Sequence, residues 1–406
     1  MSLFDDSAMG KQVVVERGPA CGACKLKDSC KSPKIPLQGE GRRGILIVLA
    51  GPTRLDDERG RYVERIKAIA PKLAKNGLDV NRDCWVTGAA VCYAKGGHET
   101  AHAQHCRYTL LETVQSLRPK VCILVGDVAC AGLLQADFKH GCDSRAATWA
   151  GEVIPSQELN CWIIPTFDTV RWEYPGEGMM ADNAIEHAAR LCDTRPWSWN
   201  QAPDYADAVR TIYDDDEAVA AIEEIEAQGY PIAFDYETNT LRPETEGSKI
   251  YSVAFSNGVD TFACPWYNGV ATATKNFLIG ECPKIAANMK FEYRWSRSKL
   301  GIDIKNLVWD TMLSAHHLQC RPGNTGLKFQ AYALLGQPEY NSQVDKYFQG
   351  KAWELNSIDR LDSEVLLVYN GMDALLELLV ACKQTSVVGL ELNFPNLSEL
   401  LPNVDV

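Results

Sequence analysis

The sequence predicts an α/β protein of two domains, and three observations carry that prediction. The chain has 406 residues, which favours two domains of roughly 200 residues each over one ordinary core. Its first half alternates short apolar runs with helical patterns, whereas its second half begins with a helix and several strands and ends in helices. Hydrophobic residues make up 46% of the chain, which is enough for two cores.

The first domain is predicted to contain a parallel sheet. Strand-like runs occupy residues 44–51 (GILIVLAG), 84–94 (CWVTGAAVCYA), 120–126 (KVCILVG) and 161–167 (CWIIPTF). Helical patterns separate them over residues 61–76 and 109–117, and again after Gly126. Strands that alternate with helices are typical of parallel α/β sheets. Residues 193–208 mix Pro, Trp and polar residues without a period, so we place a first domain at 1–195, a linker at 196–208 and a second domain at 209–406.

The second domain is predicted to be a mixed α/β domain. Residues 214–229 (DDDEAVAAIEEIEAQG) begin with acids and end with Gly, which are helix start and stop signals. Strands are expected at residues 231–238, 249–258 and 261–266, paired antiparallel. Helices are expected at residues 309–319 (WDTMLSAHHLQ) and 364–383 (EVLLVYNGMDALLELLVACK).

Carboxylates in the second domain follow a spacing that suits metal binding. Asp235 and Glu237 are two residues apart on a predicted strand, so their side chains point to the same face. Tyr369 and Asp373 are four apart on a predicted helix and share a face there. Further acids at Glu292 (in NMKFEYRW) and Asp310 complete the candidates. Ordinary solvent-exposed acids are the alternative for the first pair alone.

Together these segments resemble the three exonuclease motifs of family A DNA polymerases: a D-x-E strand, an N-x-K-F-(D/E) segment and a Y-x-x-x-D helix. The resemblance covers residues 229–385 and includes TGLKFQAYALLG at residues 325–336. It implies a ribonuclease H-like fold and a 3′-5′ exonuclease that uses two Mg²⁺ or Mn²⁺ ions about 4 Å apart. Glu292 departs from the Asp found in many relatives, which keeps Asp310 as the alternative for the second motif.

The resemblance also implies a role for each residue. Asp235 would bind both cations, and Glu237 and Asp373 would bind the one that activates water. Glu292 would hold the other cation through water, and Tyr369 would orient the attacking water. Oxygen ligands of this kind are what hard divalent cations prefer.

Four cysteines in the first domain form a second candidate site. Cys21 and Cys24 make a C-x-x-C pair, and Cys92 and Cys106 follow fourteen residues apart. In a large chain without an export signal, metal ligation is a sharper hypothesis than disulfides for a cysteine-rich sequence. Spacing alone does not separate zinc from an iron–sulfur cluster. Cys30 is an additional thiol that we interpret as a neighbour of the site.

Residues 15–192 resemble the family 4 uracil-DNA glycosylases, through CGACKLKDSC, GEGRRGILIV, RPKVCILVGDVACAGLL and IIPTF. The resemblance implies a [4Fe–4S] cluster held by Cys21, Cys24, Cys92 and Cys106. However, the family's catalytic positions fall on Ala50, Gly88 and Asp168, which lack the usual groups. We therefore expect a catalytically degenerate glycosylase domain that binds DNA or a partner. Residual activity through unorthodox acids is the alternative, for which the candidates are Asp56, Asp57, Glu58 and Asp168.

Charge and hydropathy limit the environment of the chain. The net charge is −12, and it arises from the second half: residues 1–200 carry 25 basic against 24 acidic residues, and residues 201–406 carry 16 against 29. That asymmetry fits a carboxylate-rich module, or simply a solvated acidic surface. No run approaches the ~18 apolar residues of a membrane span, and residues 1–10 lack the features of a signal peptide. We expect a cytoplasmic protein, in the host cytoplasm if the source is a bacteriophage, with no membrane partner.

The combination of a glycosylase-like and an exonuclease domain resembles the N-terminal part of some bacteriophage DNA polymerases. The leading hypothesis is a proofreading 3′-5′ exonuclease that acts on single-stranded or frayed DNA and meets a separate polymerase or replisome subunit. The alternatives are a stand-alone DNA-processing exonuclease, a non-catalytic DNA-binding subunit and a glycosylase with unorthodox residues.

Overall fold

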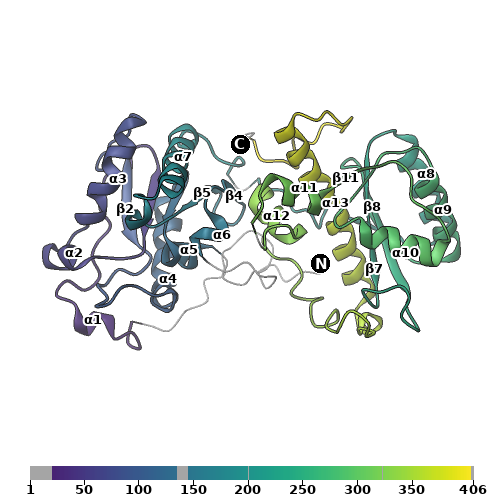
Figure 1. The fold of residues 1–406 in the computed structure, drawn as a ribbon, viewed down its shortest axis with the longest axis horizontal. Coiled ribbons are helices and arrows are strands. Elements are labelled where there is room, and N and C mark those ends of the chain that lie inside the picture. Colours follow the sequence, from purple (N-terminus) through teal and green to yellow (C-terminus); the bar gives the residue numbers. More distant parts are fainter. Residues whose placement is uncertain (1–20, 135–144, 200, 322, 404–406) are drawn as a thin grey trace. The chain divides into compact units, whose positions relative to one another are not determined.

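The computed structural model describes residues 21–134, 145–199, 201–321 and 323–403. These residues divide into two compact units, and the chain passes from the first to the second between residues 202 and 203. That point lies within the predicted linker of residues 196–208. Figure 1 shows both units, each with a β-sheet covered by helices.

The N-terminal unit is built on a five-stranded sheet. Its strands are β1 (Ile45–Leu49), β2 (Cys84–Gly88), β3 (Val121–Val125), β4 (Ile154–Ser156) and β5 (Cys161–Thr166). Its helices are α1 (Leu26–Ser29), α2 (Arg54–Arg59), α3 (Glu64–Lys75), α4 (Thr100–Leu117), α5 (Asp127–Leu133), α6 (Ala146–Trp149), the short η1 (Thr169–Arg171) and α7 (Pro175–Leu191). The strand order is β2-β1-β3-β5-β4. Side chains of β1 and β3 pack with those of α3 and α7 in one buried core.

The prediction of a parallel sheet needs one correction in this unit. Strands β2, β1, β3 and β5 are parallel, but β4 pairs antiparallel with β5, so the sheet is mixed. Strand β4 has only three residues and includes Pro155. A segment that short shows no periodicity, and proline is tolerated at an edge strand where its nitrogen has no partner to bond.

The C-terminal unit is built on a six-stranded sheet of order β11-β10-β7-β8-β9-β6. Its strands are β6 (Arg210–Thr211), β7 (Ile232–Thr238), β8 (Ile250–Ser256), β9 (Thr261–Pro265), β10 (Lys284–Ala286) and β11 (Leu307–Asp310). Its helices are α8 (Asp215–Ala227), α9 (Asn268–Ile279), α10 (Lys290–Leu300), α11 (Thr311–Leu318), α12 (Leu327–Leu335), η2 (Ile358–Arg360) and α13 (Ser363–Val388). Strands β7, β8 and β9 pair antiparallel, as predicted, and β6, β10 and β11 pair parallel to their neighbours.

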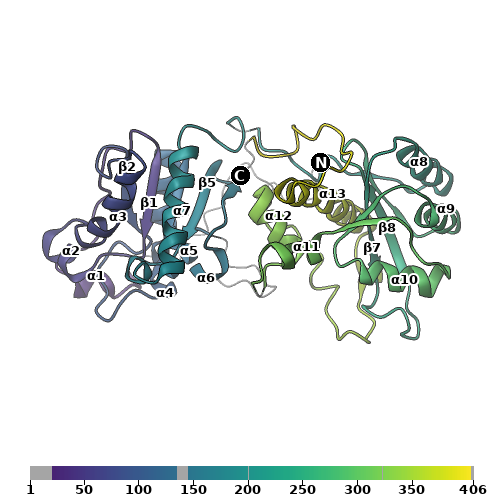
Figure 2. The same cartoon turned by 45° about the horizontal axis from the view of Figure 1, so that its top comes forward.

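Helices cover both faces of this second sheet, as the turned view in Figure 2 illustrates for α8 and α9 and for α13. On one face Phe234, Phe255 and Phe262 pack with residues of α8, α9 and α10. On the other face Ala254 and Ala263 pack against Leu367 and Ala374 of α13. The small alanines let α13 approach the sheet closely, and this approach is what brings its polar residues to β7.

Two predicted elements differ in detail. Trp309 and Asp310, expected in a helix, end strand β11, and α11 begins at Thr311 because the Asp310 side chain accepts a hydrogen bond from the Leu313 N–H.

Helix α13 is long and apolar enough to span a membrane by length and composition, but its most apolar window is 94% buried inside the protein. Here it serves as a core helix of the second unit.

Candidate carboxylate metal site

Strand β7 sorts its side chains between two environments. Phe234 and Tyr236 belong to the apolar core under α8, α9 and α10. Asp235 and Glu237 alternate with them and therefore point to the opposite face, toward α13. The D-x-E spacing thus places two carboxylates together on the polar side of a strand whose other side is anchored by aromatic packing.

Helix α13 supplies the third carboxylate and also fixes the first. The Asn370 Nδ2 donates to Asp235 Oδ2 over 2.7 Å, and the Ser252 hydroxyl of β8 donates to Asn370 Oδ1 over 2.8 Å. One turn further along α13 lies Asp373. The hydrogen-bonded chain from β8 through Asn370 holds Asp235 in one orientation and keeps the helix in register with the strand.

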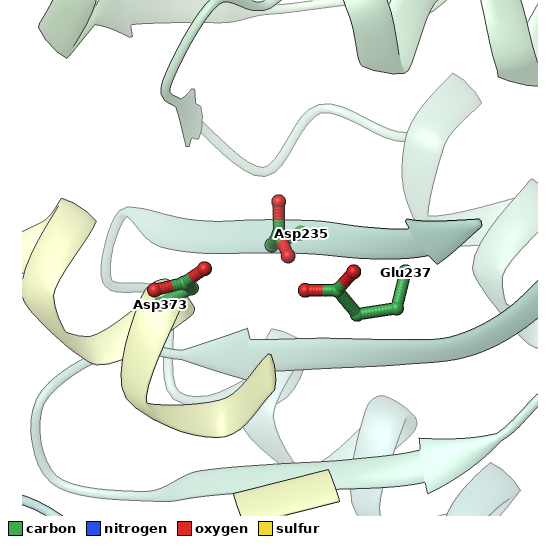
Figure 3. Close-up of side chains that lie close together, drawn as sticks. All are labelled: Asp235, Glu237 and Asp373. Atoms are coloured by element: carbon green, nitrogen blue, oxygen red, sulfur yellow. The ribbon is translucent and has the colours of Figure 1, made fainter. Parts of the chain in front are cut away.

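Asp235, Glu237 and Asp373 form a compact acidic triad, with one oxygen of each within 4.8 Å of the others. Figure 3 shows the three side chains converging from β7 and α13. Glu237 and Asp373 are buried, and Asp235 keeps some solvent exposure. Among the described residues, no other set of three or more Asp, Glu, His or Cys side chains comes this close. Three hard oxygen donors at this separation suit a divalent cation.

The carboxylates of the triad disfavour one another's charged forms. Burial, and then the charge of Asp373, raise the pKa of Asp235 well above its usual value. Burial, and then Asp235 and Asp373, raise the pKa of Glu237 in the same direction. Both shifts mean that the negatively charged forms are disfavoured until a positive charge enters.

A lysine that sequence reasoning missed supplies part of that positive charge. Lys328 of α12 donates to both oxygens of Asp373, at 2.6 Å for Oδ2, and the Tyr340 hydroxyl donates to the same carboxylate. The ammonium also lies 4.8 Å from the centre of the Tyr340 ring and 4.6 Å from that of Tyr369. Lys328 falls within TGLKFQAYALLG, the segment quoted for the resemblance, but nothing in its spacing indicated a contact with Asp373.

Tyr369 lies on α13, one turn before Asp373. It is buried, and its ring packs against those of Tyr340 and Phe348. Burial, and then Asp373, Glu237 and Asp235, raise the pKa of its hydroxyl well above the ordinary value of 10. The hydroxyl therefore stays protonated near neutral pH and can donate a hydrogen bond beside the triad.

The two candidates for the second motif occupy different environments. Glu292 of α10 is 2% exposed, and burial followed by the charge of Asp235 raises its pKa well above 4.5. Asp310 instead accepts hydrogen bonds from the backbone N–H groups of Asn288, Met289 and Leu313. Its carboxylate thereby joins the ends of α10 and α11. Asp310 is thus engaged by backbone groups, whereas Glu292 is buried and influenced by the charge of Asp235.

The predicted cysteine ligands lie in one neighbourhood of the N-terminal unit. Cys21 and Cys24 precede α1, Cys92 follows β2, and Cys106 is on α4. Burial, and then the thiols of Cys92, Cys24 and Cys21, raise the pKa of Cys106. Burial, and then Cys92, raise the pKa of Cys30, so the additional thiol also lies beside the set. Within the described residues these thiols are not as close together as the acidic triad.

The acids that could have replaced the glycosylase residues are engaged in structural contacts. Asp56 accepts hydrogen bonds from the N–H groups of Thr53, Val63 and Glu64, and Asp57 accepts from those of Lys31 and Ser32. Glu58 pairs with Arg54. Asp168 pairs with Arg65 and caps η1. Each of these carboxylates therefore takes part in local structure.

Gly88, one of the three positions compared with the glycosylase family, has no room for a larger side chain. A side-chain carbon at Gly88 would lie 2.4 Å from the Ala90 carbonyl oxygen and 2.9 Å from the Tyr62 hydroxyl. The amide side chain found there in the glycosylase family would not fit without rearrangement of this backbone. Ala50, the first position, is itself 5% exposed and carries no polar group.

The acidic triad, on a strand and a helix packed against it, is consistent with a divalent-cation site. Residues 209–383 match the family model described as 3′-5′ exonuclease. The C-terminal part of the chain is thus a 3′-5′ exonuclease domain. The match covers less than half of the chain.

Known structures resemble the chain only distantly. Escherichia coli RNase D is 16% identical, with 45% of this chain and 46% of that chain covered and a TM-score of 0.35. The catalytic core of Trypanosoma brucei RRP6 is 16% identical, with 50% of each chain covered and a TM-score of 0.35. The Aedes aegypti Nibbler EXO domain is 16% identical, with 46% of this chain and 92% of that chain covered and a TM-score of 0.34.

These likenesses are too weak to bear on the substrate of this chain. It spans about half the length of the RNase D and RRP6 chains that it matches. No curated protein matches the chain.

Proposed function

We propose that this chain is a metal-dependent 3′-5′ exonuclease that hydrolyses phosphodiester bonds at single-stranded or frayed DNA 3′ ends. The observation that carries the proposal is the acidic triad, whose oxygens lie within 4.8 Å of one another inside the domain that matches the exonuclease family. Mg²⁺ or Mn²⁺ bound there would stabilise the attacking and leaving oxygens of an in-line displacement at phosphorus.

The residues of the chain divide the remaining work. Asp235, Glu237 and Asp373 would hold the cations, and Asn370 keeps Asp235 oriented through its hydrogen bond. Tyr369, protonated and next to Asp373, would orient the attacking water. Glu292 would hold the second cation. Lys328 contacts Asp373 and offsets part of the negative charge of that carboxylate.

A strand-degradation assay tests this function. Single-stranded DNA labelled at its 5′ end should shorten progressively in Mg²⁺ and stay intact in EDTA. Asp235→Ala should reduce the rate by several orders of magnitude, because a ligand shared by both cations is lost. An RNA strand of the same sequence run in parallel defines the preferred sugar. An intact strand with the unaltered protein in both Mg²⁺ and Mn²⁺ would contradict the proposal.

We further infer that the exonuclease edits for a polymerase supplied by a separate polypeptide. The resemblance to bacteriophage polymerases with a glycosylase-like domain supports this, since editing requires that a frayed primer end pass from a polymerase site to the exonuclease. Affinity capture from the native source, followed by mass spectrometry, should recover a polymerase or another replisome component. Recovery of none, with the isolated protein fully active, would favour a stand-alone DNA-processing enzyme.

For the N-terminal unit we propose a degenerate glycosylase domain with a [4Fe–4S] cluster on Cys21, Cys24, Cys92 and Cys106. The mutual influence of these thiols supports a shared site. Tetrahedral zinc is the alternative for four thiolates. Anaerobically purified protein should contain about four iron atoms per chain; stoichiometric zinc without iron would refute the cluster.

The degenerate interpretation predicts that uracil is not released from uracil-containing DNA. The engaged carboxylates of Asp56, Asp57 and Asp168 support it, since each already binds backbone or arginine groups. The measurement requires the Asp235→Ala background, so that strand degradation does not hide abasic products. Abasic sites formed in a single turnover would show that this domain has kept glycosylase chemistry. The domain would otherwise serve DNA or partner binding.

A further inference from the structure

Two loops of the C-terminal unit are hydrogen-bonded to each other at the end of β7. The first loop, residues 239–249, begins directly after β7 and leads to β8. The second loop, residues 350–357, directly precedes η2. The Asn356 N–H donates to the Asn239 carbonyl over 2.7 Å, and the Asn356 Nδ2 donates to the Thr238 carbonyl over 3.1 Å. The second loop is therefore fixed to the end of the strand that carries two carboxylates of the triad.

The first loop is itself held in one shape. The Asn239 Nδ2 donates to the Gly247 carbonyl over 3.0 Å, and the Asn239 Oδ1 accepts from the Lys249 N–H over 2.8 Å. The Thr240 hydroxyl donates to the Ala352 carbonyl of the second loop over 3.2 Å. Side chains exposed on these two loops therefore stand on a fixed frame, as recognition of a ligand requires.

An indole ring and a guanidinium group are exposed on this frame. Trp353 of the second loop is 59% exposed, whereas tryptophan in folded proteins is highly buried on average. The Arg242 guanidinium of the first loop lies over the indole, 5.8 Å from the ring centre, which is within the range of cation–π attraction. Glu244, the acid closest to Arg242 in the chain, is already paired with Arg294 over 2.9 Å. Arg242 forms no ion pair with a described residue, so its charge is available to a phosphate.

This pair of side chains suits a single-stranded nucleic acid. Bases of any sequence stack on aromatic rings, and arginine adds positive charge for the sugar-phosphate backbone. Trp353 precedes Asn356 by three residues, a stretch that spans at most about 11 Å, and Asn356 bonds to the last residue of β7. The ring therefore lies within reach of a strand whose 3′ end occupies the triad, a few nucleotides from that end.

We propose, on the basis of the proposed function, that Trp353 stacks on a base of the single-stranded substrate, 5′ to the bond that is cut, and that Arg242 binds a phosphate next to that base. A base inside a duplex keeps its own stacking neighbours and does not offer its face to the indole. The two loops thereby favour single-stranded and frayed ends over paired ends, which the carboxylates alone do not distinguish.

Strand binding by the full-length protein tests the proposal in an Asp235→Ala background, which keeps the strand intact. The probe is a 5′-fluorescein-labelled single strand of about ten nucleotides, as DNA and as RNA of the same sequence, followed by fluorescence anisotropy. Trp353→Ala should weaken binding of the tighter-binding strand about tenfold, and Trp353→Phe, which keeps a ring, should retain most of the affinity. The control Tyr267→Ala removes a 39% exposed ring at the start of α9 and should bind as the Asp235→Ala parent does. Unchanged binding of both strands by Trp353→Ala would overturn the proposal.

Abasic probes separate stacking from a merely structural role. In the parent protein, removal of the base that meets the indole should weaken binding about tenfold. Trp353→Ala should be insensitive to removal of that base, because the stacking partner is already lost. Arg242→Ala should reduce the slope of log affinity against log salt concentration by about 0.7, since one phosphate contact is lost. A Trp353→Ala protein that melts at a lower temperature and responds to every abasic position as the parent does would assign Trp353 a structural role and overturn the proposal.

Nuclease assays keep this proposal distinguishable from the proposed function. If strands are degraded, Trp353→Ala in the otherwise unaltered protein should raise the KM for single strands about tenfold. An unchanged KM, with unchanged strand affinity, would remove Trp353 from the path of the strand and leave the exonuclease proposal intact. If no strand is degraded but Trp353→Ala weakens strand binding and abolishes the abasic effect, the exonuclease proposal fails and the strand-binding site stands.

Discussion

At the scale of single residues, the acidic site is a balance between carboxylates that repel one another and the few groups that offset them. Asn370 offers Asp235 a hydrogen bond, and Lys328 and Tyr340 offer theirs to Asp373. Burial still raises the pKa values of Asp235, Glu237, Glu292 and Glu377. These shifts disfavour the ionised carboxylates, and a cation bound beside them would stabilise the ionised forms.

The first prediction concerns Lys328, whose ammonium supplies positive charge to Asp373 as a bound metal ion would. Lys328→Met should raise the affinity for Mn²⁺ about tenfold or more, since a unit positive charge at contact distance opposes an incoming cation. Calorimetric titration of the full-length protein measures the change. Lys305→Met, which removes an exposed lysine, should leave the affinity unaltered. Weaker binding in Lys328→Met would show that the lysine organises the ligands instead of competing with the metal.

Sequence reasoning recognised the residues whose spacing is regular and missed those that reach the site from elsewhere. Two-residue spacing on a strand and four-residue spacing on a helix placed Asp235, Glu237, Tyr369 and Asp373 in advance. Lys328 and Tyr340 come from a different part of the chain, and only tertiary packing brings them to Asp373.

At the scale of elements, the site depends on how precisely three segments are held against one another. Asp310 ends β11, caps α11 and accepts hydrogen bonds from two N–H groups at the start of α10, whose first turn carries Glu292. The Asp310 carboxylate positions this helix, whereas Glu292 is buried and influenced by the charge of Asp235. We therefore expect the two acids to have separable roles.

The contrast between Asp310 and Glu292 gives the second prediction. Asp310→Asn should lower the free energy of unfolding by about 1–2 kcal/mol, because an amide accepts these N–H hydrogen bonds less well than a carboxylate does. Its nuclease rate at saturating Mg²⁺ should change little. Glu292→Gln should show the reverse pattern, with stability kept in EDTA and activity reduced. Denaturant titration measures the stability of both variants, and strand degradation measures their nuclease rates. A larger loss of activity in Asp310→Asn than in Glu292→Gln would assign the structural role to Glu292 and the role in the site to Asp310.

Strand β7 and helix α13 carry the third prediction, which concerns pH. The carboxyl groups of Asp235, Glu237 and Glu377 have raised pKa values in the folded state. Groups of this kind hold protons more tightly when folded, so they stabilise the fold at low pH, and that stabilisation is lost as the pH rises through their raised values. In EDTA, the protection of backbone amide hydrogens in β7 and α13 against hydrogen exchange should therefore decrease from about pH 5 to about pH 8. The comparison is made after correction for the intrinsic exchange rate at each pH.

Divalent cations should reverse this trend, because they bind the deprotonated carboxylates. Mg²⁺ should restore protection in β7 and α13 more strongly at about pH 8 than at about pH 5. Hydrogen–deuterium exchange of the full-length protein gives both values in one series, with helix α3 of the other unit as the internal reference. Protection in EDTA that increases with pH would mean that Lys328 and Asn370 already compensate the carboxylates.

At the scale of the whole molecule, the charge asymmetry of the two halves acquires a partial explanation. Residues 201–406 carry 29 acidic against 16 basic residues, and five of those acids gather at or beside the site.

The alternation of apolar runs with helices predicted the first sheet because buried parallel strands are continuous apolar segments. Its antiparallel edge strand β4 and the two-residue β6 were not predictable, since segments of two or three residues form strands only through their neighbours.

The division into two units leads to the last prediction, that metal chemistry in one unit is separable from metal chemistry in the other. Cys92 is buried beside Cys30 and Cys106, and its sulfur accepts a hydrogen bond from the Lys34 N–H. Cys92→Ser should therefore lower the melting temperature of the N-terminal unit and abolish iron binding. The nuclease rate per folded molecule should change less than about threefold, because the acidic triad belongs wholly to the other compact unit. Differential scanning calorimetry measures the melting temperatures, and parallel strand-degradation assays measure the nuclease rate. The matched control is Cys264→Ser, which replaces a buried cysteine of β9 in the second unit. A Cys92→Ser protein that loses nuclease activity while its C-terminal transition is unchanged would show that the first unit contributes directly to the reaction, for instance by holding the DNA strand.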